Sequence, residues 1–81
     1  MKITQTEKDQ IKDYLSDQLL VDREEITDDS NLETNLNMDS LDKLEMSYEF
    51  EEMFKVNEIP ESKLAEIKTV QDVYDYLETL D

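Results

Sequence analysis

The sequence predicts an all-α protein, a four-helix bundle with three main helices and a short third helix. Three segments carry apolar residues at spacings of three and four, which is the period of a helix with one buried face. Residues that cap helices precede these segments. A polar stretch over 21–38 forms a long loop between the first two helices. We find no internal repeat or linker, so residues 1–81 are expected to form a single small domain.

The first helix is expected from about Glu7 to about Leu20. Thr4 or Thr6 can cap it, and Thr6-Glu7-Lys8-Asp9 resembles a capping box. No glycine stops it, so its C-terminal boundary is open by several residues. Its buried stripe consists of apolar residues at four-residue spacing, joined by one tyrosine: Ile11, Tyr14, Leu15 and Leu19.

The connection over 21–38 is rich in Asp, Asn, Ser and Thr. Asp28-Asp29-Ser30-Asn31 has the composition of a turn. An EF-hand calcium loop starting at Asp29 would need glycine and glutamate at positions six and twelve, but Thr34 and Ser40 stand there. We therefore expect no metal site. Single apolar residues are expected to hold this loop on the core: Val21, Ile26, Leu32 and Leu36.

The second helix is expected from about Ser40 to about Phe54, with Asp39 or Ser40 as its cap. At 100° per residue its apolar residues fall on two opposite faces. One face carries Met46, Phe50, Met53 and Phe54, and it suffices to dock the helix on a small core. The inward Ser47 is expected to bond back to a carbonyl one turn earlier.

The second face of this helix is an apolar strip bordered by carboxylates, which is typical of an interaction surface. A competing interpretation is that both faces are internal. The residues of the predicted partner surface are Leu41, Asp42, Leu44, Glu45, Tyr48, Glu51 and Glu52.

The third helix is short and is expected from about Glu61 to Ile67, with Pro60 suited to its first position. Thr69 caps the last helix, with Asp72 three residues further on. The buried stripe of the last helix is expected to contain Val70, Val73, Tyr74 and Leu77, and Leu80 to complete it.

Composition restricts the function. The net charge of −15 argues against nucleic acid and anionic membranes as partners and favours a protein with a basic patch. The chain has no cysteine and no histidine, so it lacks a thiol nucleophile and the usual general base near neutral pH. We therefore expect no enzymatic activity. No apolar leader follows Met1 and no stretch reaches membrane-spanning length, so we expect a cytoplasmic protein.

Several motifs in one order resemble those of the acyl carrier proteins, over nearly the whole chain. They are Val21 with Glu24-Glu25-Ile26-Thr27, Leu36 with Asp39-Ser40-Leu41-Asp42, Glu45 with Glu51-Glu52 and Phe54, Glu58-Ile59-Pro60, Ile67 with Thr69-Val70-Gln71, and Asp75-Tyr76. In that family the serine of Asp-Ser-Leu carries 4′-phosphopantetheine. The resemblance therefore implies Ser40 as the attachment site, flanked by Asp39 and Leu41.

The resemblance implies a non-catalytic, monomeric carrier that holds acyl groups as thioesters and presents them to enzymes of the fatty-acid-synthesis type. A phosphopantetheinyl transferase from outside the chain would attach the arm. The bundle is expected to open and shelter an acyl chain among Met46, Phe50, Phe54, Ile67 and Tyr74. Aminoacyl, D-alanyl or polyketide cargo is an alternative with the same arm. An unmodified acidic adaptor, in which Ser40 only caps a helix, is an alternative from another class.

The sequence departs from the family pattern near the motif. Asn35-Leu36-Asn37 stands where Asp-Leu-Gly is usual. Asparagine tolerates the left-handed conformation, so the turn is expected to survive. Lys43 places a positive charge beside the expected attachment site, and Tyr48 replaces an aliphatic residue or methionine.

Overall fold

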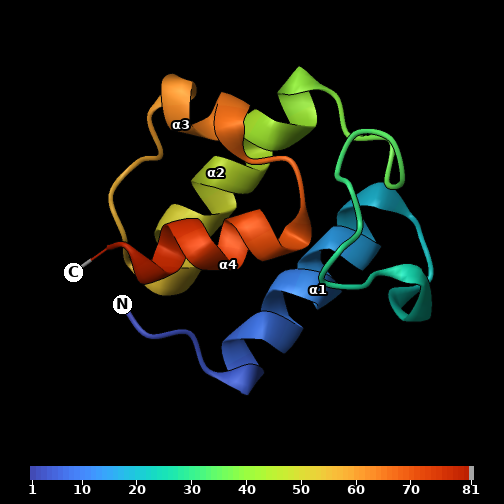
Figure 1. The fold of residues 1–81 in the computed structure, drawn as a ribbon, viewed down its shortest axis with the longest axis horizontal. Helices are drawn as coiled ribbons and strands as arrows, with labels where there is room; N and C mark the ends of the chain where they lie inside the picture. Colours follow the sequence, from blue (N-terminus) through green and yellow to red (C-terminus); the bar gives the residue numbers. More distant parts are fainter. Residues whose placement is uncertain (81) are drawn as a thin grey trace.

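The computed structural model describes residues 1–80, and within them the fold is entirely helical apart from one isolated antiparallel bridge between Asn31 and Thr69. The helices are α1 (Gln5–Leu19), a short 3₁₀ helix η1 (Arg23–Glu25), α2 (Ser40–Phe54), α3 (Glu61–Glu66) and α4 (Val70–Glu78). Figure 1 shows α4 in front of α2, and the N-terminal residue lies on the same side of the molecule as the end of α4. The all-α prediction is confirmed, with the bounds of α2 as expected.

Capping boxes begin the three main helices. Thr4, rather than Thr6, caps α1, and the Glu7 side chain returns to the Thr4 backbone N–H at 3.0 Å. The helix therefore starts two residues earlier than expected, because the reciprocal pair of Thr4 and Glu7 lies two residues nearer the N-terminus than that of Thr6 and Asp9. The expected pair of Thr69 and Asp72 caps α4. In place of glycine, Leu20 ends α1 in the left-handed conformation.

One hydrophobic core joins all four helices and the long loop. Its fully buried large side chains include Phe50 of α2 and Tyr74 of α4, and the Tyr14 ring packs edge-on against Phe50 at 5.9 Å. Leu19 and Val21 are only partly buried. The other three expected loop anchors, Ile26, Leu32 and Leu36, are buried. Two further residues that the sequence pattern did not mark are also buried: Ile3, before α1, and Met38, in the loop.

Backbone hydrogen bonds fix the middle of the long loop against the segment that leads from α3 into α4. The Leu32 N–H donates to the Lys68 carbonyl at 2.8 Å, and the Val70 N–H donates to the Ser30 carbonyl at 3.1 Å. The α3 helix ends at Glu66, and Ile67 follows in extended conformation with its side chain buried. Residues 30–32 therefore join the long loop to the segment that follows α3.

Burial of two tyrosines sets an alkaline limit to stability. Burial, reinforced by the Glu49 and Glu45 carboxylates, raises the pKa of Tyr14 to about 12. The pKa of Tyr74 is also raised, mainly by burial and to a lesser extent by the nearby Asp28 carboxylate. The folded pKa values of both tyrosines exceed the unfolded value of about 10. Burial of the neutral phenols therefore stabilises the fold fully below a pH of about 10, and this stabilisation is lost as the pH rises through the folded pKa values.

The free energy of unfolding is therefore expected to fall above pH of about 10, more steeply in the parental chain than in Tyr14→Phe. Urea titrations at pH 8, 10 and 11, followed by circular dichroism, measure this slope. Lysine deprotonation acts equally on both proteins, so the difference between them isolates Tyr14. Equal slopes would contradict the assignment.

Candidate functional site

The start of α2 is capped so that the Ser40 hydroxyl is left free. The Asp39 carboxylate accepts from the Asp42 N–H at 2.8 Å, and the Asp42 carboxylate accepts from the Asp39 N–H at 3.2 Å. Asp39 is thus the cap, and Ser40 is the first helical residue. Ser40 is exposed, and within residues 1–80 no side chain or backbone group hydrogen-bonds its hydroxyl. The serine is available for modification without loss of the cap.

A left-handed residue directs the loop into this helix start. Asn37 has φ of 60°, in the region where glycine is favoured and asparagine is tolerated. The prediction that an asparagine preserves this turn is confirmed. The next residue, Met38, is buried, and its N–H donates to the Leu32 carbonyl at 2.8 Å. These contacts fix Asp39 and Ser40 at the surface.

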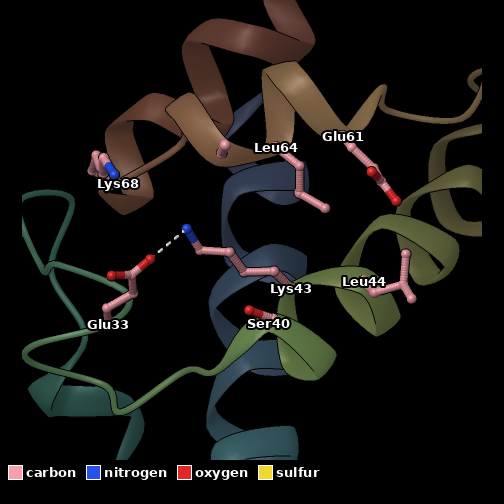
Figure 2. A pocket seen from close by; sticks show the side chains of 8 residues that line it. Glu33, Ser40, Lys43, Leu44, Glu61, Leu64 and Lys68 are labelled. Carbon is pink, nitrogen blue, oxygen red and sulfur yellow. Dashed lines mark hydrogen bonds and ion pairs between the residues drawn. The ribbon is translucent and has the colours of Figure 1, made fainter.

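Ser40 borders a groove of about 480 Å³ between α2 and α3 (Figure 2). Figure 2 shows Leu44 and Glu61 toward one end of the groove, and Lys43, Glu33 and Lys68 toward the other. The lining residues are Glu33, Ser40, Lys43, Leu44, Glu61, Leu64, Ala65 and Lys68. Such a groove, beside a free hydroxyl, can receive a group that is attached to that hydroxyl.

Lys43 is buried in the wall of this groove. Only 7% of the residue is exposed, and its ammonium donates to Glu33 Oε1 at 2.8 Å and to the Ile67 carbonyl at 3.1 Å. The Lys43 ammonium lowers the pKa of Glu33. The positive charge expected beside Ser40 therefore lies inside the bundle, where it joins α2 to the long loop and to the segment after α3.

The residues of the predicted partner surface differ in how far they are exposed, because α2 packs on the rest of the bundle. Leu41 is 61% exposed and Tyr48 is 51% exposed, whereas Leu44 is half-buried and lines the groove. Glu45 and Glu52 are exposed beside them, with Asp42 and Glu51 partly covered. The interpretation that both faces of α2 are internal is wrong for Leu41 and Tyr48.

The residues predicted to hold an acyl chain lie in the core and not along the groove. Four of them, Met46, Phe50, Ile67 and Tyr74, are at most 3% exposed, and Phe54 packs on Phe50 with ring centroids 5.7 Å apart. Their contact with an acyl chain stays a prediction. None of these five residues lines the groove beside Ser40.

The expectation for Ser47 is wrong. Ser47 is 1% exposed, and its hydroxyl has no hydrogen-bond partner among the described residues, so it does not bond back to a carbonyl one turn earlier. Sequence spacing placed this serine inward correctly. It could not show that the surrounding groups leave the hydroxyl unpaired.

Neither a metal cluster nor a membrane-spanning helix is found in the described part of the chain. No group of three or more acidic side chains within residues 1–80 is arranged to hold a metal ion. None of the helices there has the length and apolar character needed to cross a bilayer.

Comparison with known proteins identifies the family. Residues 9–77 match the family described as "Phosphopantetheine attachment site". The acyl carrier protein of Syntrophobacter fumaroxidans is 45% identical over 67 residues, covering 83% of this chain and 82% of that protein. Those of Thermosynechococcus vestitus and Amoebophilus asiaticus are 41% and 44% identical over 69 and 68 residues, covering 85% and 84% of this chain and 84% of each relative. The chain belongs to the phosphopantetheine-attachment family of carrier proteins.

The prosthetic group of this family is covalently attached 4′-phosphopantetheine, and the start of α2 fits it. The Ser40 hydroxyl is exposed and has no hydrogen-bond partner among residues 1–80, so its oxygen is accessible for a phosphodiester link. When attached, the group supplies a thiol, which this cysteine-free chain lacks. The helix N-terminus favours an anion, but the Asp39 and Asp42 carboxylates already occupy it and offset part of that attraction.

Proposed function

We propose that Ser40 carries the phosphopantetheine arm and that the chain presents acyl thioesters to enzymes of fatty acid synthesis without catalysing a reaction itself. The observation that carries this proposal is the free, exposed hydroxyl of Ser40 at the first position of α2, beside a groove. Asp39 caps the helix, so Ser40 has no structural task that attachment would disturb. Aminoacyl, D-alanyl or polyketide cargo would use the same serine and is the alternative.

The attachment reaction is assigned to a separate transferase. Activation of a serine hydroxyl needs a base, and no hydrogen bond joins Ser40 to a carboxylate or a lysine within residues 1–80. The transferase and the later acyl-handling enzymes are expected to bear basic patches, and the carrier to act as a monomer.

Intact mass spectrometry tests the proposal. Incubation of the purified chain with coenzyme A, magnesium and a phosphopantetheinyl transferase is expected to add the mass of one phosphopantetheine. The product should then accept an acyl group as a hydroxylamine-labile thioester. A chain that gains no mass would instead be an unmodified acidic adaptor.

We also propose that the transferase contacts the exposed part of α2 around Leu41 and Tyr48, bordered by Glu45 and Glu52. Exposed carboxylates steer a basic partner and act mainly on the association rate. Reversal of Glu45 or Glu52 to lysine is therefore expected to slow arm attachment about tenfold at low salt. The loss should shrink at 0.5 M salt, where these charges are screened. Initial rates over a salt series measure it.

The matched controls are Glu24→Lys and Glu78→Lys. Both glutamates are exposed, lie on η1 and α4, and undergo the same change of charge. They are expected to slow attachment much less. If they slow it as much as the substitutions on α2, the net charge of the chain is responsible and the α2 surface is not the docking site.

A further inference from the structure

A polar stripe runs along α2 from the attachment site into the bundle. Ser40, Lys43 and Ser47 are spaced i, i+3 and i+7, so they lie on one side of the helix. Lys43 and Ser47 are both buried. A carrier that stores an alkyl chain beside this stripe would be expected to have apolar residues at these two positions, since buried polar groups need hydrogen-bond partners.

The Lys43 ammonium retains capacity to bind an acceptor. An ammonium has three N–H donors, and among the described residues two of them have partners, Glu33 and the Ile67 carbonyl. The Glu33 side chain is 50% exposed, so this partner can turn into solvent and be replaced. Lys68 lines the same end of the groove and adds a second positive charge (Figure 2).

The local charge balance of the groove differs from that of the whole chain. The protein carries a net charge of −15, but the groove is lined by two lysines and two glutamates. Glu61 lies toward the Leu44 end, whereas Lys43 and Lys68 face the end that contains Glu33. An added carboxylate at that end would meet two ammonium groups and one carboxylate. Charge-assisted hydrogen bonds to an ammonium are among the stronger ones in proteins.

An alkyl chain fits this end poorly. It would strip water from the Lys43 ammonium and offer no acceptor in return, and burial of an unpaired charge is costly. A cargo attached through Ser40 also has a high effective concentration at the groove, in the millimolar range for a short flexible tether. A contact with Lys43 of submillimolar affinity would therefore be well populated.

We propose that Lys43 selects the cargo, by binding the carboxylate of an acyl group that carries a second carboxyl at its far end. This inference rests on the proposed function, since the cargo reaches the groove only on an arm at Ser40. The bound carboxylate accepts a hydrogen bond from the third Lys43 N–H or takes the place of the Glu33 carboxylate. The Lys68 ammonium attracts the same carboxylate at longer range. An alkyl chain of equal length lacks this contact and stays outside this end of the groove.

The test compares two cargoes of equal length, octanoyl and suberyl, the second ending in a carboxylate. Each is loaded on the full chain from its coenzyme A thioester by a transferase, and attachment is verified by mass. We expect the suberyl form to melt about 3–5 °C above the octanoyl form, from millimolar effective concentration and a contact of submillimolar affinity. Lys43→Met should remove this difference and Lys43→Arg should retain it. Lys63→Met, an equal change of charge outside the groove, is the control and should retain it.

The outcomes separate this inference from the proposed function. A chain that accepts neither arm refutes the attachment at Ser40. A chain that accepts both but melts at the same temperature with either cargo refutes only the carboxylate site. A suberyl advantage that persists in Lys43→Met also refutes it, because another group would then bind the carboxylate.

Discussion

Replacement of Ser40 by alanine is expected to abolish phosphopantetheine attachment and leave the fold unchanged. In the proposed function the Ser40 hydroxyl oxygen forms the phosphodiester, so its removal leaves nothing to modify. The cap of α2 comes from Asp39 and Asp42, and alanine is tolerated at the first helical position. Intact mass after incubation with coenzyme A, magnesium and transferase measures the loss, and thermal unfolding followed by circular dichroism verifies the fold.

The other four serines are poor acceptors for physical reasons. Ser30 and Ser47 are buried, and the Ser16 hydroxyl donates to the Val21 carbonyl at 2.6 Å. Ser62 is the other exposed serine, in the six-residue helix α3. The matched control is therefore Ser62→Ala, which should be loaded fully. A mass gain in Ser40→Ala would overturn the assignment, and peptide mapping would show which serine carries the arm.

The fold was predictable because its signals are local. Apolar spacing marks the buried stripe of α4, and the pair of Thr69 and Asp72 marks its start. The start of α1 was less certain, because two threonines could serve as the cap and only the structure shows Glu7 paired with Thr4. The short helix η1 was missed, since three residues without a buried side chain give no periodic signal.

The site was only partly predictable, because the burial of Lys43 depends on distant parts of the chain. The Asp-Ser-Leu motif predicts Ser40 as the attachment site, and Asn37 predicted the left-handed turn that the structure shows before it. The burial of Lys43 could not be read from α2 alone. Its ammonium is paired with Glu33, ten residues earlier, and with the Ile67 carbonyl, twenty-four residues later. Contacts at such separations depend on how the loop and α3 pack.

Truncation of Phe50 to alanine is expected to have the largest effect on stability. Phe50 is fully buried in the C-terminal half of α2 and packs against Tyr14 of α1 and Phe54 of its own helix. Such truncations cost about 3–5 kcal/mol, while a domain of this length has a total stability of about 4–12 kcal/mol. Urea unfolding followed by circular dichroism should show the free energy of unfolding lowered by about 3–5 kcal/mol, a large part of the total.

Leu41→Ala is the contrasting variant on the same helix. Leu41 is 61% exposed, so its truncation should change the free energy of unfolding by no more than about 0.5 kcal/mol. If Leu41 lies in the partner surface, the same change should slow arm attachment, with less dependence on salt than the charge reversals. A loss below about 1 kcal/mol for Phe50→Ala would contradict the tight packing described for this core. It would favour a bundle loose enough to admit an acyl chain beside Phe50 without rearrangement.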